Sequence, residues 1–252
     1  VIAYPDIGYG KEMADIFART IEQRGGAVVA KISYDRKATD YGKTARAIAK
    51  AKPDAIFIPD AGSKVAEVVS YLARENVWGV SGSVKPSSVK TKRRLVHYLG
   101  TSLWQEPLLL EQAGDYVTGA TIPAWYSVAA TDAASKAFTE RYRVVYASEP
   151  SIYEAFAYDS VVWLRESILE TGMRHPESVR DALAAPTPRE GVTGSARFVS
   201  WGEADRDLRF ITVSSKQFSP LKVRVKVLAR EFLEGTKAAN DSSEPENTPS
   251  NP

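Results

Sequence analysis

The chain has 252 residues, of which 44% are hydrophobic and 25% charged, enough for one large domain or two small ones. Its 33 basic and 31 acidic residues nearly balance, which argues against a dedicated nucleic-acid-binding protein. No apolar run reaches the roughly 20 residues that a membrane helix requires. With no cysteine and only two histidines, the sequence excludes a disulfide framework and a thiolate or histidine-rich metal site.

The first 122 residues alternate short apolar runs with helical patterns. Strands are predicted at 1–4, 27–32, 55–58, 95–99 and 119–122. Amphipathic helices are predicted between them, at 13–21, 44–51 and 65–74. Strands separated by helices predict right-handed βαβ units, and therefore an α/β fold built on a parallel sheet.

Residues 123–190 differ, because their pattern predicts three helices and no strand. The helices are predicted at 132–146, 152–170 and 176–184, and Ser151 and Glu154 have the spacing of a capping box. Their apolar faces, which include Phe138, Tyr142, Val145, Phe156, Val162 and Trp163, need a sheet that this chain does not contain. Since a strand begins at Val1 with no methionine before it, we expect a longer protein whose N-terminal portion supplies that sheet.

The last part of the sequence predicts two strands, at 195–199 and 208–213, across a turn at 202–205. Residues 216–234 fit either a strand or a helix. From Gly235 onward, Ser, Asn, Glu and Pro dominate, which predicts a disordered tail.

The sequence predicts no enzyme, cofactor or metal site. Gly42-Lys43-Thr44 would need a glycine where Lys37 stands to form a phosphate-binding loop, and the segment 62–64 fails the same test. No Gly-x-Ser-x-Gly elbow is present, and neither His97 nor His175 has a plausible serine partner. The basic run at 85–94 is interpreted as a solvated loop, since one short run in a nearly neutral chain creates too weak an electrostatic potential to bind an anionic partner.

Small, polar and aromatic residues follow four of the predicted strands, at the ends where open parallel sheets bind ligands. They are Tyr9 after the first strand, Asp60, Ala61 and Ser63 after the third, Thr101, Ser102 and Trp104 after the fourth, and Trp125 and Tyr126 after the fifth. Such a rim suits a polar small molecule, and a helix start at Ser63 would offer N–H groups to an anion. The alternative for each single residue is helix capping or packing.

The order and spacing of several short motifs resemble the second lobe of type I periplasmic binding proteins, the leucine/isoleucine/valine-binding type of ABC-transporter solute receptors. The motifs are Tyr4-Pro5-Asp6, Tyr9-Gly10, Gly25-Gly26, 53–57, Leu99-Gly100-Thr101, 153–159 and 191–194, and they cover about residues 1–214. Within this family, the run 99–104 and the pair Tyr158-Asp159 resemble the penicillin-binding protein activators.

The resemblance implies a two-lobed fold from which the N-terminal lobe is missing. The implied parts are a three-layer parallel lobe at 1–122, a returning helical segment of the first lobe at 123–190, strands crossing back at 191–214, an extension at 215–234 and a tail at 235–252. The family's binding positions carry over to Tyr9, Ala61 and Ser102. Many amino-acid receptors have an acidic residue where Ser102 stands, to hold the ligand's ammonium group.

The resemblance further implies a non-enzymatic periplasmic protein, lipid-anchored in its full-length form, that closes over an amino acid or short peptide. A membrane permease would be its partner. The alternative is a penicillin-binding protein activator, a regulatory lipoprotein that contacts a peptidoglycan synthase. Neither function involves nucleic acid or a transmembrane segment. With half of the cleft absent, the chain alone is expected to bind ligand weakly.

Overall fold

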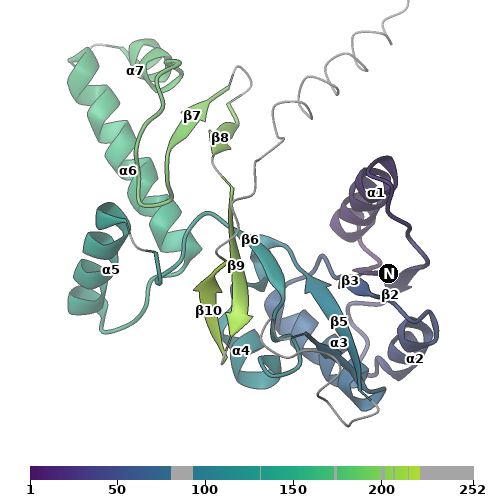
Figure 1. Cartoon of the computed structure of the whole chain (residues 1–252). Helices are drawn as coiled ribbons and strands as arrows, with labels where there is room; N and C mark the ends of the chain where they lie inside the picture. The colour runs from purple at the N-terminus through teal and green to yellow at the C-terminus, as the bar shows by residue number, and fades with distance from the viewer. Residues whose placement is uncertain are drawn as a thin grey trace, which may run out of the picture. The chain divides into compact units, whose positions relative to one another are not determined.

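A computed structural model describes residues 1–80, 93–130, 132–172, 175–199, 202–206, 208–214 and 216–221 (Figure 1). Residues Val1–Leu221 form one compact unit. Most of the basic run at 85–94, most of the extension at 215–234 and the whole predicted tail at 235–252 lie outside the described residues.

The described chain is organised around a mainly parallel sheet with the strand order β10-β9-β6-β5-β3-β1-β2, and β4 pairs with β5 (Figure 1). Its strands are β1 (Ile2–Pro5), β2 (Lys31–Tyr34), β3 (Ala55–Phe57), β4 (Val77–Gly79), β5 (Arg94–Leu99), β6 (Thr121–Ala124), β9 (Arg209–Ser214) and β10 (Gln217–Pro220). Among the described strands of this sheet, only the β6–β9 and β9–β10 pairs are antiparallel. The prediction of a parallel α/β fold is confirmed.

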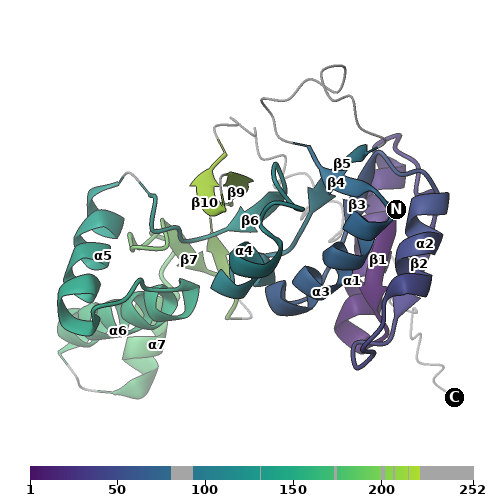
Figure 2. The ribbon, with the colours of Figure 1, turned by 90° about the horizontal axis from the view of Figure 1, so that it is seen from below.

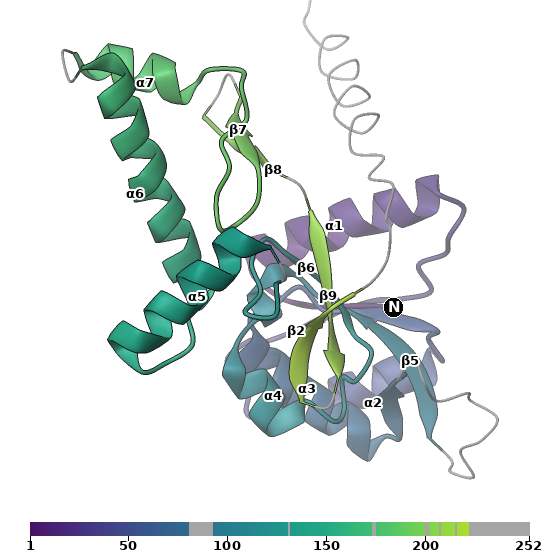
Figure 3. The ribbon, with the colours of Figure 1, turned by 60° about the vertical axis from the view of Figure 1, so that its left-hand side comes forward.

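Helices cover both faces of this sheet and make three layers. They are α1 (Gly8–Gln23), α2 (Gly42–Lys50), α3 (Gly62–Arg74) and α4 (Pro107–Ala113). The helices α2, α3 and α4 lie along one face, where Val65 and Leu72 of α3 pack on Ala3 and Ile56 (Figure 2). The helix α1 covers the opposite face (Figure 3).

The alternation of side chains along β1 explains why both faces need a helix. Ala3 belongs to the cluster under α2, α3 and α4, whereas its neighbour Ile2 packs with Ala14 and Ala18 of α1. Successive residues of a strand point to opposite faces. A strand that is apolar on both faces therefore requires cover on both, as parallel sheets generally do.

A second group of elements consists of α5 (Ala133–Tyr146), α6 (Ile152–Thr171), α7 (Pro176–Leu183) and the hairpin of β7 (Ala196–Phe198) and β8 (Ala204–Arg206). The predicted capping box is confirmed, because both Ser151 and Glu154 make the reciprocal bonds at the start of α6. Buried Asp159 accepts hydrogen bonds from the backbone N–H groups of Val192 at 2.8 Å and Thr193 at 2.9 Å. These bonds attach the 191–194 loop to α6.

Several sequence predictions need correction. The strands predicted at 195–199 and 208–213 do not pair, because β7 pairs with β8 and β9 joins the main sheet beside β6. The second strand begins at Lys31 rather than residue 27, since only Lys31–Tyr34 stand in register with β1. The short elements β4, α4 and β8 are not predicted, and α4 begins with a proline directly before three leucines. The strand β10 lies in the segment 216–234, for which the sequence leaves a strand or a helix open.

The expectation that the helical faces lack cover is wrong for two of the residues on which it rests. Phe138 is 6% exposed and packs on Tyr126, and Trp163 is 1% exposed and packs on Phe198. Other apolar side chains of α5 and α6 are exposed, namely Val144, Val145, Tyr146, Tyr153, Val161, Leu164 and Leu169. Within the described residues, no helix combines the length and hydrophobicity of a membrane span.

We predict that this exposed surface makes the chain self-associate, because contiguous apolar patches drive association in water. Val161 and Leu164 are three residues apart and share one face of α6. Replacing both with lysine should increase the monomer fraction in sedimentation velocity. The control is Arg165→Glu, which changes charge without removing apolar area. A wild-type chain that stays monomeric at high concentration would contradict the prediction.

Candidate functional site

The carboxyl ends of β2, β1 and β3 form one edge of the sheet, with β1 in the middle. Arg36 comes two residues after β2, and Asp60 comes three residues after β3. Their side chains meet, because Arg36 Nε donates to Asp60 Oδ1 at 2.9 Å. Since β1 lies between β2 and β3, this bond crosses the sheet edge at the end of β1.

Asp60 is the buried centre of this edge. Only 2% of it is exposed. In addition to Arg36, it accepts hydrogen bonds from the Tyr34 hydroxyl at 2.9 Å and from the Ala61 backbone N–H at 2.8 Å. Burial, followed by the negative charge of Asp60 and the bond to it, raises the pKa of the Tyr34 phenol well above its usual range. Tyr34 therefore stays protonated and donates.

The turn that carries Arg36 is fixed by its own hydrogen bonds. The Ala38 N–H donates to the Asp35 carbonyl at 3.1 Å, and the Lys37 N–H donates to Asp35 Oδ1 at 2.9 Å. Aspartate is favoured at the first position of such turns for this reason. The Tyr41 hydroxyl donates to the Arg36 carbonyl at 3.3 Å. The Arg36 side chain remains 43% exposed.

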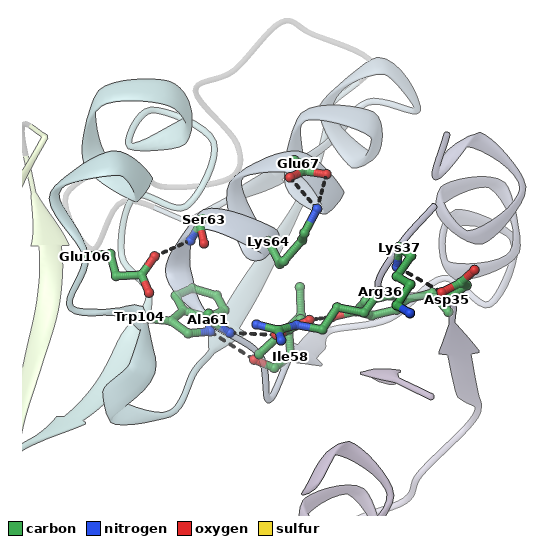
Figure 4. Close-up of polar contacts among 12 residues, drawn as sticks. Asp35, Arg36, Lys37, Ile58, Ala61, Ser63, Lys64, Glu67, Trp104 and Glu106 are labelled. Atoms are coloured by element: carbon green, nitrogen blue, oxygen red, sulfur yellow. Dashed lines mark hydrogen bonds and ion pairs between the residues drawn. The ribbon is translucent and has the colours of Figure 1, made fainter. Parts of the chain in front are cut away.

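At the start of α3, a carboxylate of the chain itself accepts a hydrogen bond from the helix backbone. The Ser63 backbone N–H donates to Glu106 Oε2 at 2.6 Å (Figure 4). Gly62 permits this approach, because a Cβ there would lie 3.0 Å from Glu106 Cβ and 3.1 Å from the Trp104 carbonyl oxygen. The Ser63 N–H, predicted to bind a ligand anion, is therefore already hydrogen-bonded. The alternative for this position is helix capping, and here Glu106 caps the helix.

The structure places Tyr9 on the first turn of α1, directly after β1, with 40% of its surface exposed. Gly10 makes this position possible, since a Cβ there would lie 2.2 Å from the Pro5 carbonyl oxygen. The helix can therefore begin immediately beyond the strand. Tyr9 stands beside the end of β1, the strand that the Arg36–Asp60 bond crosses.

The residues after β5 are less accessible. Thr101 is 6% exposed, and its hydroxyl has no partner among the described residues. Ser102 is half-buried and begins a short 3-10 helix, Ser102–Trp104. Trp104 has no exposed surface, and its indole Nε1–H donates to the Ile58 carbonyl at 2.9 Å. Trp104 is therefore a core residue and does not present its ring to a ligand.

The two aromatic residues after β6 belong to packing clusters. Tyr126 is 2% exposed, its hydroxyl lies 2.7 Å from the Thr139 hydroxyl, and its ring meets Phe138 edge to face. The Trp125 ring lies 6.0 Å from that of Phe156. Neither residue is near the Arg36–Asp60 bond in the strand order, because β6 is separated from β1 by β5 and β3.

A pocket of about 490 Å³ lies away from this edge. Its lining includes Gln105 and Leu110 from the β5–α4 region, Tyr126, Ile152 and Phe218. Gln105 donates to the Tyr126 carbonyl at 3.0 Å. Of the predicted site residues, only Tyr126 lines this pocket, so it is a different feature from the strand-end site.

Sequence reasoning missed Arg36 and Glu106. A signal for Arg36 exists, because it follows a predicted strand in the same way as Asp60 does, and the strand-end rule applies equally there. No local signal exists for Glu106, since 43 residues separate it from Ser63.

Comparison with known proteins gives the chain a family. Residues 1–217 match the family model described as periplasmic binding protein. The chain belongs to this family. It contains the mainly parallel lobe typical of the type I architecture. Among curated proteins, a sequence search finds no match.

Solved structures show the same fold. A putative branched-chain amino acid ABC transporter from Rhodospirillum rubrum matches with a TM-score of 0.69, 25% identity, and coverage of 87% of this chain and 59% of that one. The transporter substrate-binding protein LivJ from Streptococcus pneumoniae, in complex with isoleucine, matches with a TM-score of 0.67 and 22% identity. That match covers 88% of this chain and 60% of LivJ. A solute-binding protein from Rhodopseudomonas palustris, in complex with 3,4-dihydroxybenzoic acid, matches with a TM-score of 0.69 and 18% identity. That match covers 91% of this chain and 61% of the other protein. The chain thus spans about three fifths of these proteins.

Replacing Trp104 with phenylalanine should destabilise the fold. The substitution keeps an aromatic ring but removes one of two donors to the buried Ile58 carbonyl, which also accepts from the Asp60 N–H at 3.1 Å. Losing the indole hydrogen bond costs about 1 kcal/mol. Trp78→Phe is the matched control, because Trp78 is only partly buried and its indole N–H has no partner among the described residues. Urea unfolding measures both variants, and equal losses would contradict the assignment of Trp104 as a hydrogen-bonded core residue.

Replacing Glu106 with alanine should weaken the start of α3. The Ser63 N–H loses its acceptor, and loss of a helix N-terminal cap costs about 1 kcal/mol. Glu111→Ala, an exposed glutamate on α4, controls for the change in charge. Unfolding free energies of the two variants should differ by that amount. Identical stabilities would show that the Glu106 contact does not stabilise the helix.

Proposed function

We propose that the chain is part of a solute-binding protein of an ABC transporter. In this proposal it binds a small organic acid, such as an amino acid or an aromatic acid, at the carboxyl ends of β1, β2, β3 and β5. The observation that carries the proposal is the polar edge around Asp60, in a chain whose residues 1–217 match the periplasmic binding protein family. The matched structures with isoleucine and 3,4-dihydroxybenzoic acid support this ligand class.

The proposed contacts are those predicted residues that remain accessible or have unused polar groups. Tyr9 offers an exposed ring beside the end of β1. The Thr101 hydroxyl has no partner among the described residues, and Ser102 is half-buried next to it. A ring that packs on the ligand and hydroxyls that fix its orientation are what small-molecule sites generally provide.

The proposed mechanism is non-enzymatic. In it, residues 1–122 form one lobe and 123–190 belong to the other, and a ligand that touches both lobes stabilises only their closed arrangement. A membrane permease would then recognise the closed form in the periplasm. The matches reported above are transporter binding proteins, and they lend no support to the alternative of a penicillin-binding protein activator.

Binding to this chain is testable by nuclear magnetic resonance titration with leucine, isoleucine, benzoate and 3,4-dihydroxybenzoate at millimolar concentration. At least one acid should bind, weakly, and perturb the signals of Tyr9 and Thr101. Tyr9→Ala should weaken binding about fivefold, the value of one lost aromatic contact. Tyr153→Ala, which removes a more exposed ring from α6, should leave it unchanged. Absence of binding by all four acids would contradict the proposal.

A further inference from the structure

Arg36 is held in position before any ligand arrives. Its backbone lies in the turn closed by the Asp35 carbonyl and the Ala38 N–H, and its carbonyl accepts from Tyr41. Its guanidinium is fixed through Nε by the buried carboxylate of Asp60. A long side chain normally loses much rotamer freedom when it binds. Arg36 has already lost that freedom on folding, so it is preorganised for binding.

The same contact leaves the outer part of the guanidinium available. Within the described part of the chain, Nε donates to Asp60 and neither terminal nitrogen of Arg36 has an acceptor. The neighbouring acidic groups are already engaged by donors of the chain. Asp35 accepts from the Lys37 N–H, Glu106 accepts from the Ser63 N–H, and Glu67 binds the Lys64 ammonium (Figure 4).

We propose that Arg36 is the anion-binding residue on this side of the site, and that the ligand presents a carboxylate to its two terminal nitrogens. This inference rests on the proposed function and specifies its ligand. Many amino-acid receptors place an acidic residue against the ligand's ammonium group, and an acidic residue could not bind a carboxylate in this way. The ligand's acid group, not an amino group, is what this edge of the sheet recognises.

The chemistry favours a carboxylate for geometric reasons. A guanidinium presents N–H groups in a planar fork that matches the two oxygens of a carboxylate. The bond from Nε to Asp60 orients that fork without using its outer pair of nitrogens. The position over the end of β1 is where parallel sheets bind ligands. Phosphate can also accept from such a fork, so the test includes it.

The test compares acids with their neutral amides, using benzoate with benzamide and leucine with leucinamide on the 252-residue chain. The acid that binds should bind at least about tenfold more tightly than its amide, the lower range for a hydrogen bond to a charged group. Arg36→Gln should reduce that preference to within about twofold. Lys37→Gln removes the adjacent exposed cation and should leave the preference unchanged.

A direct readout comes from the Arg36 Nε–Hε signal, which benzoate should shift and benzamide should not. Arg36→Lys, which retains the charge but not the fork, should have intermediate affinity and an unchanged unfolding temperature. If Arg36→Gln keeps the full preference for the acid, the inference is wrong while the proposed function stands. If inorganic phosphate displaces the acid at equal concentration, the assignment to a carboxylate is wrong. If no acid binds at all, the proposed function itself fails.

Discussion

One buried carboxylate holds the functional edge of this protein together. Asp60 is 2% exposed, and a carboxylate removed from water stays charged only when donors surround it. It obtains three donors, from Tyr34, Arg36 and the Ala61 backbone. These donors come from the end of β2, the turn that follows it and the start of α3. The bonds therefore tie two loops together across the end of β1, and they decide where the Arg36 guanidinium lies.

The sequence predicts the sheet well because its information is local. The strands β1, β3 and β5 are short apolar runs, and the helices α1, α2 and α3 repeat their apolar residues at helical spacing. The strand-end rule then leads to Asp60, and applied to the second strand it also leads to Arg36. What the rule cannot decide is burial, which depends on distant partners. Trp104 and Tyr126 follow strands as a ligand wall would, yet bonds to Ile58 and Thr139 place them in packed clusters.

The two groups of elements in the described chain differ in how completely they bury apolar surface. The sheet and its four helices enclose two clusters, and Ile56, Ile58 and Leu72 are fully buried in the larger one. By contrast, α5 and α6 combine a buried side, with Phe138 and Trp163, and an exposed one, with Val161 and others. The strand-end site around Asp60 therefore lies on the part of the chain that buries its apolar side chains most completely. This packing keeps Arg36 and Asp60 in fixed positions.

The most direct test of this account is the mobility of the Arg36 guanidinium, measured by ¹⁵N relaxation of its Nε–Hε group. If Asp60 fixes Arg36, its order parameter should be close to that of rigid backbone, about 0.85, and should fall in Asp60→Asn. Arg19, an exposed arginine on α1, provides the mobile reference. An Arg36 order parameter below about 0.6, equal to that of Arg19, would contradict the central role of Asp60.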